Sequence, residues 1–533
     1  MPTQCAAIKW WGLFTGKLVL TPRFFRLAGL PLALGLAAAV LRWLALAQTP
    51  FANGWDSYFY LVQLKSWIET GHMHSPEASL VYPLMRGFVW LFGDYVSGYK
   101  WCAASLAGWA VGLAAWGNIK QAPTGAAGQS APRFWSAAPA LLPALILLFS
   151  PQLTFFTAQY PKNLLGFAFF LCLVYSMPEK PGEGWRAVIT PLIWLIINYF
   201  GHRLTFVLSA LYLLFWAMWA YGVKIRGVLS GRQAGIALLV LAILSVLASW
   251  LFPGLFHPAD LERLSGVLGK GFQFAPWSFV QDFGPSRMKG WWLAEIAVAV
   301  LLLLLTAVRL AVKPWRMAVT LRTKALFTLG ILLLFPGLEW SMTGVVCRFF
   351  MVYVLLAPLM AFDGRRMGML WSYTTGILLF AGALLSWRSY VPSLHDPDYR
   401  LFAQVTAAAS TDEPYSSARP LLVIAPNALA EYFTFTTGVD ALPWLPEYPV
   451  DTARLWRIAG QMRQKTVEYY ANGSVCHLPG GYLWVREDRW QAALERARME
   501  GDSVYVEQAT GWPNPSRQRP AYLLRRKQAN AGQ

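Results

Sequence analysis

Asp56 is the first acidic residue of the chain and lies in the stretch Gly54-Trp55-Asp56-Ser57-Tyr58-Phe59-Tyr60, directly after the first long apolar segment. A carboxylate at the point where a chain leaves a bilayer is either a solvated loop charge or a catalytic group that can take a proton. Arg42 lies near the end of the same apolar segment, where it can snorkel to the interface or face a polar cavity that binds a ligand.

Further charged residues stand at the ends of later apolar segments. Lys162, His202 and Arg203 either anchor the chain at a membrane interface or line a binding site. Glu339 and Arg348 lie on opposite sides of a tight turn between two apolar segments, where a structural ion pair is the simplest interpretation. Cations gathered near Asp56 would instead suit a phosphate group, which guanidinium and ammonium groups hold through charge-assisted hydrogen bonds.

A divalent metal site is possible near Asp56, because four potential ligands follow it: Glu69, His72, His74 and Glu77. A polar loop is the simpler explanation of these residues, so we assign no metal ligand and no other cofactor. The five cysteines show no CxxC spacing, which favours neither a zinc site nor a disulfide framework.

The composition is that of a polytopic membrane protein. Hydrophobic residues make up 56% of the 533 residues and charged residues only 14%, and the mean hydropathy is +0.40. The net charge of +18 could suggest nucleic acid, but residues 1–387 hold 29 Lys and Arg against 12 Asp and Glu, whereas residues 388–533 hold 16 against 15. The positive charge therefore belongs to the membrane part, and we expect no nucleic-acid partner.

Apolar runs long enough for a bilayer core of about 30 Å predict eleven transmembrane helices. They lie near residues 28–47, 97–117, 134–150, 163–178, 187–200, 204–222, 234–254, 291–312, 325–343, 349–362 and 369–387. The first could be a signal peptide that is cleaved after Ala45-Leu46-Ala47, but its length and Arg42 favour a retained span.

Basic residues in the short loops set the orientation. With the N-terminus and the basic segment 1–27 in the cytoplasm, every predicted inner loop carries at least two cations, and nine of the twelve acids of the membrane part face or approach the outside. We therefore predict a multi-pass protein of the cytoplasmic (inner) membrane. Asp56, the long outer loops 48–96 and 255–290, and the tail 388–533 would be extracytoplasmic, with residues 80–92 as an interfacial helix.

The tail alternates strand-like and helical patterns, which predicts a soluble α/β domain. Strands are expected at residues 421–425, 482–485, 504–507 and 522–524, and helices at 452–471 and 488–500. A phosphate-binding glycine loop is absent from the sequence, which argues against a nucleotide-driven motor.

The arrangement resembles the GT-C superfamily of membrane glycosyltransferases, which includes protein O-mannosyltransferases, lipid A aminoarabinose transferases and oligosaccharyltransferases. The matching residues are Gly54 to Tyr60, followed by Lys65-Ser66-Trp67-Ile68-Glu69-Thr70-Gly71 and Tyr82-Pro83-Leu84. The resemblance covers residues 28–387 in topology and only the first outer loop in motif. Many family members have a second acid here, whereas this chain continues with Ser57-Tyr58, which argues against metal dependence of the oligosaccharyltransferase kind.

The resemblance implies transfer of a sugar from a polyprenyl-phosphate carrier to an envelope glycolipid, glycan or protein. Asp56 would be the general base of an inverting displacement, and Tyr58 and Tyr60 could stack on the sugar or belong to an interfacial aromatic belt. Arg348 is the preferred contact for the carrier phosphate. Lys162, His202, Arg203, Arg42 and Glu339 complete the expected binding residues.

Two alternatives come from other classes of protein. A transporter or lipid flippase tends to place paired ionisable groups or broken helices near mid-bilayer, whereas the acids of this chain gather at the outer side. A non-catalytic assembly protein would act through residues 390–533 and would not need Asp56.

Overall fold

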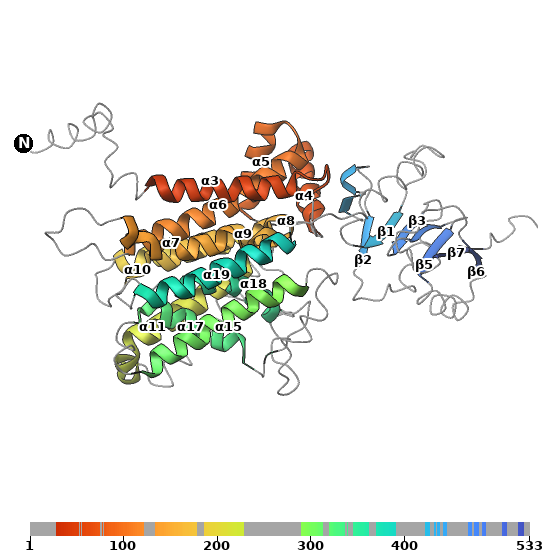
Figure 1. The fold of residues 1–533 in the computed structure, drawn as a ribbon. Coiled ribbons are helices and arrows are strands. Elements are labelled where there is room, and N and C mark those ends of the chain that lie inside the picture. The colour runs from red at the N-terminus through yellow and green to blue at the C-terminus, as the bar shows by residue number, and fades with distance from the viewer. Residues whose placement is uncertain are drawn as a thin grey trace, which may run out of the picture.

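The computed structural model describes the helical part of the chain and isolated elements of the tail. The described residues are 28–52, 54, 56–74, 77, 79–121, 134–178, 186–228, 289–312, 319–335, 338, 345–361, 369–390, 422–426, 431–432, 434–436, 441–444, 467–471, 474–478, 482–486, 504–508 and 521–526. Within them the structure is mostly helical, and long helices run side by side in one bundle (Figure 1).

The first two long helices of the bundle, α3 (Leu30–Leu46) and α6 (Tyr95–Gln121), touch through their backbones. A Cβ atom added to Gly35 would lie 2.8 Å from the carbonyl oxygen of Gly108. Small residues at such a contact are the usual way in which membrane helices approach closely, because van der Waals packing takes over where the hydrophobic effect no longer acts between helices. Helix α6 also carries Tyr99, whose hydroxyl donates to the carbonyl oxygen of Ala158 at the end of α8 (Pro151–Gln159).

The remaining long helices follow in chain order. They are α7 (Phe134–Leu148), α8 (Pro151–Gln159), α9 (Pro161–Ser176), α10 (Arg186–Gly201), α11 (Arg203–Val228), α15 (Lys289–Ala311), α17 (Leu321–Leu333), α18 (Val345–Leu356), continued by the 3₁₀ turn η2 (Ala357–Ala361), and α19 (Met369–Tyr390). Helices α7 and α8 are bent by 48° at a short break, so the span expected at 134–150 is a broken one that continues to Gln159.

Three described helices are long and apolar enough to cross a membrane, or four if the bent pair counts as one span. Six further apolar helices are shorter. The predicted count of eleven stays a prediction, since the span expected at 234–254 lies outside the described residues. The one expected at 325–343 is shifted: α17 begins earlier because the Thr320 hydroxyl caps it by accepting the Thr323 N–H, and it ends at Leu333.

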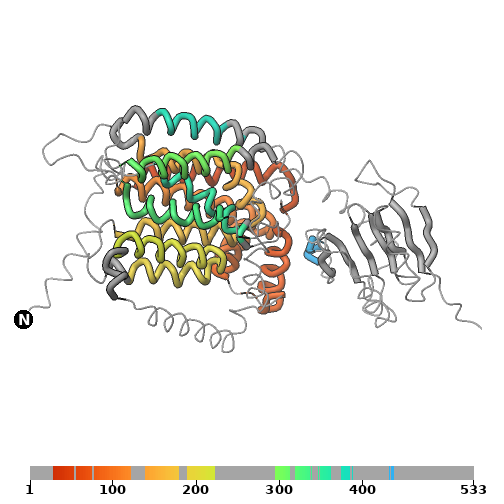
Figure 2. The backbone as a smooth tube through the Cα atoms, turned by 90° about the horizontal axis from the view of Figure 1, so that it is seen from below, coloured from red at the N-terminus to blue at the C-terminus, as the bar shows by residue number. Residues whose placement is uncertain are grey.

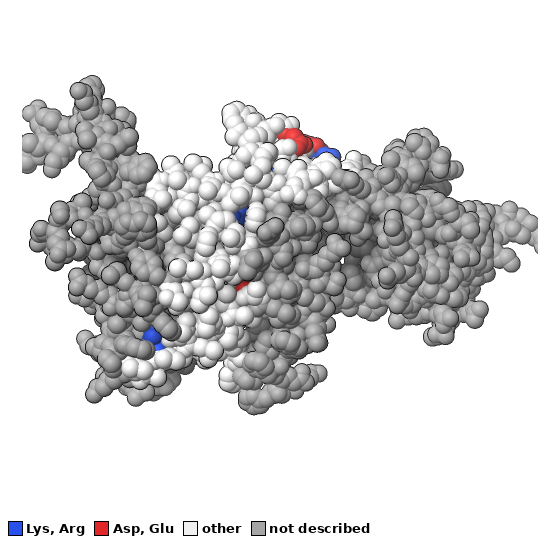
Figure 3. All heavy atoms as spheres, in the orientation of Figure 1, with Lys and Arg blue, Asp and Glu red and all other residues white. Residues whose placement is uncertain are grey.

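Two short helices, α4 (Ser57–Thr70) and α5 (Val81–Phe92), lie together at one end of the bundle (Figure 1). Helix α5 coincides with the interfacial helix predicted at 80–92, and Trp90 and Leu91 on it are 85% and 65% exposed. Large exposed apolar side chains suit a lipid boundary. Figure 3 shows little charge on the described part of this side of the bundle, apart from a group of charges near α4 and α5.

The described part of the tail holds seven strands in two sheets. The first sheet has the order β2 (Ala441–Trp444), β1 (Leu422–Pro426), β3 (Val467–Ala471) and β4 (Ser474–Leu478), and the second has β5 (Tyr482–Arg486), β7 (Ala521–Arg526) and β6 (Val504–Gln508). Strand β1 is parallel to β2 and β3, and the other pairs are antiparallel.

The four strands predicted in the tail coincide with β1, β5, β6 and β7. The helix predicted at 452–471 is wrong at its end, because Val467–Ala471 form β3, and the valine and two tyrosines there favour an extended chain. The helix predicted at 488–500 and the N-terminal segment 1–27 lie outside the described residues.

One further segment of the tail, residues 431–436 between β1 and β2, is helical at 431–432 and 434–436. Figures 1 and 2 both show it, in blue, beside the end of the bundle that holds α4. A hydrogen bond of 2.8 Å from Lys65 Nζ to the carbonyl oxygen of Phe435 joins the two. The tail therefore contacts α4.

Candidate active site

Asp56 occupies the N-cap position of α4, and a tight loop sets its place. The Ser57 hydroxyl donates to the carbonyl oxygens of Ala52 and Gly54, each at 3.0 Å, and the Ala52 N–H donates to the Tyr58 hydroxyl at 3.3 Å. An N-cap aspartate usually accepts an N–H of the first turn, but the Asp56 side chain makes no capping bond. Its carboxylate is therefore free for other partners.

The loop that carries Asp56 is pressed against the end of α8. Gly54 has a φ of +112°, and a Cβ atom there would lie 2.8 Å from the carbonyl oxygen of Ala158. Both features require glycine, because an L side chain is strained in that conformation and has no room. The Tyr99 hydroxyl donates to the same carbonyl at 2.9 Å, so the loop and α8 are held to α6 as well.

Burial raises the pKa of Asp56 to about 6. The Arg348 guanidinium opposes this rise, and the Glu77 carboxylate adds to it. A carboxylate with a pKa just below neutral pH is mostly ionised and still basic enough to accept a proton in a transition state. Asp56 is thus suited to general-base catalysis.

Three cations surround His202, which joins α10 to α11. Lys162 lies in the first turn of α9, Arg203 at the start of α11 and Arg348 in the first turn of α18. Burial, followed by the charges of Lys162, Arg348 and Arg203, lowers the pKa of His202 well below its usual value, so this imidazole is neutral. Three helix N-termini add their positive dipole ends to these cations, which makes the region a favourable place for an anion.

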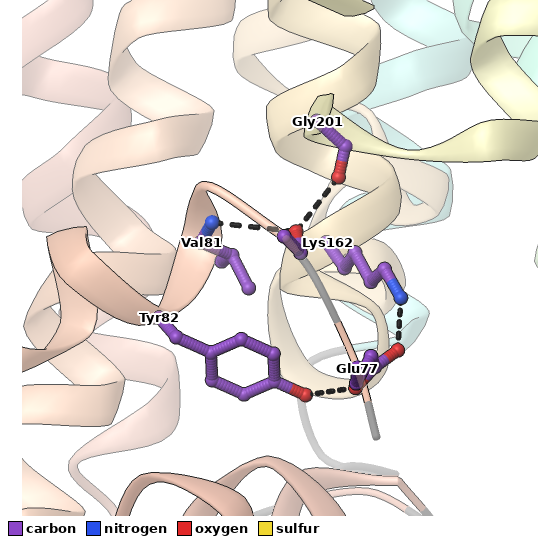
Figure 4. A network of polar contacts seen from close by, with 6 residues as sticks. Glu77, Val81, Tyr82, Lys162 and Gly201 are labelled. Atoms are coloured by element: carbon purple, nitrogen blue, oxygen red, sulfur yellow. Dashed lines mark hydrogen bonds and ion pairs between the residues drawn. The ribbon is translucent and has the colours of Figure 1, made fainter. Parts of the chain in front are cut away.

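Glu77 links this group to the outer loop (Figure 4). Its carboxylate forms an ion pair with Lys162 and accepts the hydroxyl of Tyr82. Because the Glu77 carboxylate also raises the pKa of Asp56, Glu77 interacts electrostatically with both Asp56 and Lys162. The sequence offered Glu77 only as a potential metal ligand.

The segment after Glu77 is tied to the α10–α11 junction by its own hydrogen bonds. The Ser79 hydroxyl donates to the carbonyl oxygen of Gly201 at 2.8 Å and accepts the N–H of Val81 at 3.3 Å (Figure 4). The N–H of Leu80 donates to the carbonyl oxygen of Phe200 at 2.9 Å. These bonds fix the start of α5 next to His202 and Arg203.

The two tyrosines expected near a sugar are both buried. Tyr60 is 5% exposed, and its ring centroid lies 6.2 Å from that of Tyr82 and 6.4 Å from that of Tyr99. Tyr58 is 2% exposed and packs edge-on against Tyr432 with centroids 4.9 Å apart. In this structure both rings pack against other aromatic side chains.

Arg42 has a different set of partners. Its guanidinium is fully buried and donates to the carbonyl oxygens of Leu147 at 2.9 Å and Ser150 at 3.3 Å, and to that of Leu148. These carbonyls belong to the break between α7 and α8, and Arg42 therefore neither snorkels nor joins the cations around His202. Glu339 lies outside the described residues.

Glu295 is a second buried ionisable residue at this break. Its carboxylate accepts the Ser150 hydroxyl at 2.6 Å and the Gln152 N–H at 3.0 Å. A cation thus stands at the C-terminal end of α7 and an anion at the N-terminal end of α8, which is the favourable sign at both ends. A lone glutamate in an apolar run was the only signal of this role in the sequence.

The possible metal site finds no support in the described residues, among which no group of three or more His, Cys, Asp or Glu side chains is arranged to hold an ion. Glu77 is engaged with Lys162 and Tyr82, and Glu69 accepts the Tyr95 hydroxyl at 3.4 Å.

No protein-family model and no curated protein sequence matches the chain. Among solved structures it is similar to archaeal oligosaccharyltransferase AglB from Archaeoglobus fulgidus in complex with an inhibitory peptide and a dolichol-phosphate, at 11% identity and a TM-score of 0.42 over 83% of this chain and 69% of the other.

It is also similar to ArnT from Cupriavidus metallidurans bound to undecaprenyl phosphate, at 13% identity and a TM-score of 0.48 over 92% of this chain and 97% of ArnT. The apo state of ArnT gives a TM-score of 0.44 at the same identity and coverage. The likeness is distant, so the function proposed below rests on the residues of the site.

Proposed function

We propose that the chain is a membrane glycosyltransferase that moves a sugar from a polyprenyl-phosphate carrier to a cell-envelope acceptor at the outer face of the cytoplasmic membrane. The observation that carries this proposal is the pairing of a partly buried, uncapped carboxylate with a group of cations at helix N-termini. The charge of Arg348 lowers the pKa of Asp56, and the charges of Lys162, Arg348 and Arg203 lower the pKa of His202. The two halves of the site therefore share Arg348.

The two halves match the two ends of a single displacement. Asp56 takes the proton of an acceptor hydroxyl while the acceptor oxygen forms a bond to the anomeric carbon of the sugar. The bond from that carbon to the phosphate oxygen breaks, and the electron pair leaves with the lipid phosphate. One displacement inverts the anomeric configuration.

The leaving phosphate needs no proton, but its developing charge needs fixed cations. Arg348 is exposed in this structure and free to meet a lipid headgroup, and its guanidinium suits a bidentate contact. Lys162 is held by Glu77, so a phosphate that approaches it must compete with a carboxylate. Neutral His202 offers an uncharged polar group, since its Nδ1 has no partner among the described residues.

The experiment that tests this proposal is mass spectrometry of envelope glycans and lipid-linked sugars from cells that lack the chain. We expect one glycan to lose a sugar and one polyprenyl-phosphate sugar to accumulate, which would name the product and the donor. Unchanged glycans and carriers would contradict the proposal.

Transport is a second candidate because of Arg42 and Glu295. A buried ionisable pair at a broken helix is a feature of transporters, in which such breaks hold the substrate or a coupling ion. In this chain both side chains are engaged with the ends of α7 and α8. Altered solute uptake together with an unchanged glycan profile in cells that lack the chain would favour transport.

A further inference from the structure

The 431–436 segment of the tail packs on α4 through aromatic rings. Tyr432 is 8% exposed and lies edge-on to Tyr58, with centroids 4.9 Å apart, and to Phe51 at 5.9 Å. The Phe435 ring lies 5.6 Å from that of Tyr58, and the ammonium group of Lys65 lies 5.3 Å from its centroid. Together with the Lys65 hydrogen bond, these contacts fix the segment against the first turns of α4.

Glu431 opens this segment and reaches the N-terminus of α4. Its carboxyl accepts a hydrogen bond from the backbone N–H of Phe59. With Asp56 as N-cap, Phe59 is the third residue of the helix, and its N–H is one of the two that an N-cap side chain normally accepts. Glu431 therefore fills the capping role that Asp56 leaves open.

One carboxyl oxygen of Glu431 is left without a hydrogen bond within the described part of the chain. Oε2 is buried and has no hydrogen-bond partner among the described residues. The charge of Asp56 acts on Glu431, and that of Glu431 acts on Tyr82, which bonds to Glu77. Glu431 thus lies beside the base although it comes from the tail.

We propose that Glu431 is a positioning residue that caps α4 in place of Asp56 and so keeps the Asp56 carboxylate available as the base. The inference about Glu431 rests on the proposed function only because that function makes Asp56 the general base. An uncapped Phe59 N–H would otherwise attract Asp56, because the first-turn N–H groups of a helix lack intrahelical partners. A carboxylate held by a backbone N–H is stabilised in its charged form and becomes a weaker base.

The charges around the pair are consistent with this arrangement. Burial, and then the charge of Asp56, raise the pKa of Glu431 well above its usual value, so Glu431 is the neutral member and Asp56 the one that titrates near pH 6. A neutral cap can be replaced by an amide of the same shape. The titratable and charged groups that face the two carboxyls are Glu77, Arg348, Tyr60, Tyr82 and Tyr99.

The test measures the titration of Asp56 without any sugar donor. Dicyclohexylcarbodiimide reacts with protonated carboxyl groups, and its adduct on Asp56 can be quantified by peptide mass spectrometry on the full chain in nanodiscs between pH 4 and 9. We expect half-maximal labelling near pH 6 in the wild type. In Glu431→Ala it should fall by about one pH unit, because Asp56 gains the Phe59 N–H.

Glu431→Gln keeps the capping oxygen and should label like the wild type. Thr436→Ala is the matched control, because Thr436 lies in the same segment, is exposed, and donates its hydroxyl to the carbonyl oxygen of Tyr432 at 2.9 Å. Labelling of Asp56 that is the same in Glu431→Ala, Glu431→Gln and the wild type would overturn the inference.

Transfer activity separates this inference from the proposed function. We expect Glu431→Ala to lower kcat by about 10-fold to 100-fold and to leave the KM for the lipid-linked donor unchanged, with Glu431→Gln close to the wild type. If Asp56→Asn also transfers at the wild-type rate, the proposed function fails. If Asp56→Asn is inactive while Glu431→Ala has wild-type kcat and labelling, only the role of Glu431 fails.

Discussion

Replacing Arg42 by methionine tests how the broken helix α7–α8 is held. The substitution removes a fully buried guanidinium that donates to three backbone carbonyls at the break between α7 and α8. A hydrogen bond from a charged group contributes about 1.5–3 kcal/mol, and each buried carbonyl oxygen that loses its donor adds a desolvation cost. We therefore expect Arg42→Met to lower the free energy of unfolding by about 3–5 kcal/mol.

The assay is equilibrium unfolding in mixed micelles, with Leu44→Met as the control on the same helix, since Leu44 is 51% exposed. In a double-mutant cycle with Glu295→Met, the second substitution should cost at least about 1.5 kcal/mol less in the Arg42→Met background than in the wild type. A loss below about 1 kcal/mol for Arg42→Met, or additive effects in the cycle, would refute the shared hydrogen-bond network at Ser150.

Two further predictions concern the proposed site. The kcat/KM for transfer should rise tenfold per pH unit up to an apparent pKa near 6 and level off above it. The reason is that Asp56 acts in its ionised form, while the donor phosphodiester keeps one charge throughout. A kcat/KM that stays constant between pH 5 and 7 would contradict this. Lys162→Met should weaken binding of undecaprenyl phosphate about tenfold in native mass spectrometry, whereas Glu77→Gln should leave the affinity equal or higher, since Glu77 neutralises Lys162. Tighter binding by Lys162→Met, or weaker binding by Glu77→Gln, would contradict the arrangement.

Much of the helical bundle could be predicted from local sequence. Apolar runs mark helices wherever the chain must satisfy its backbone hydrogen bonds internally, and the predicted spans that fall on described residues coincide with helices. The position of Asp56 after the first span, and of Lys162 and Arg203 at helix starts, follows from the same pattern.

The partners of these residues could not be predicted, because they are distant in the sequence. Glu77 meets Lys162 across 85 positions, and Arg42 meets Leu147 across 105. A single sequence gives the type of a charged residue and its place along a helix, but the packing of helices decides which carbonyl or carboxylate it faces. Arg42 was therefore expected among the binding residues.

The tail shows the same limit more strongly. Glu431 follows a predicted strand and has no neighbour in the sequence that points to chemistry. Its place beside Asp56 depends on how Tyr432 and Phe435 pack against α4. Likewise, the residues of β3 continued a helical pattern in the sequence, and pairing with β1 and β4 decides their conformation.

The measurement that tests the central claim most directly compares sugar transfer by Asp56→Asn with that of the wild type in proteoliposomes. The control is Asp94→Asn, another acid of the same outer loop, whose carboxylate accepts the Ser97 N–H at 2.7 Å. We predict a loss of about 10²-fold to 10⁴-fold for Asp56→Asn, with undecaprenyl phosphate still bound, and near wild-type transfer for Asp94→Asn. Wild-type turnover by Asp56→Asn would contradict the assignment of Asp56 as the base.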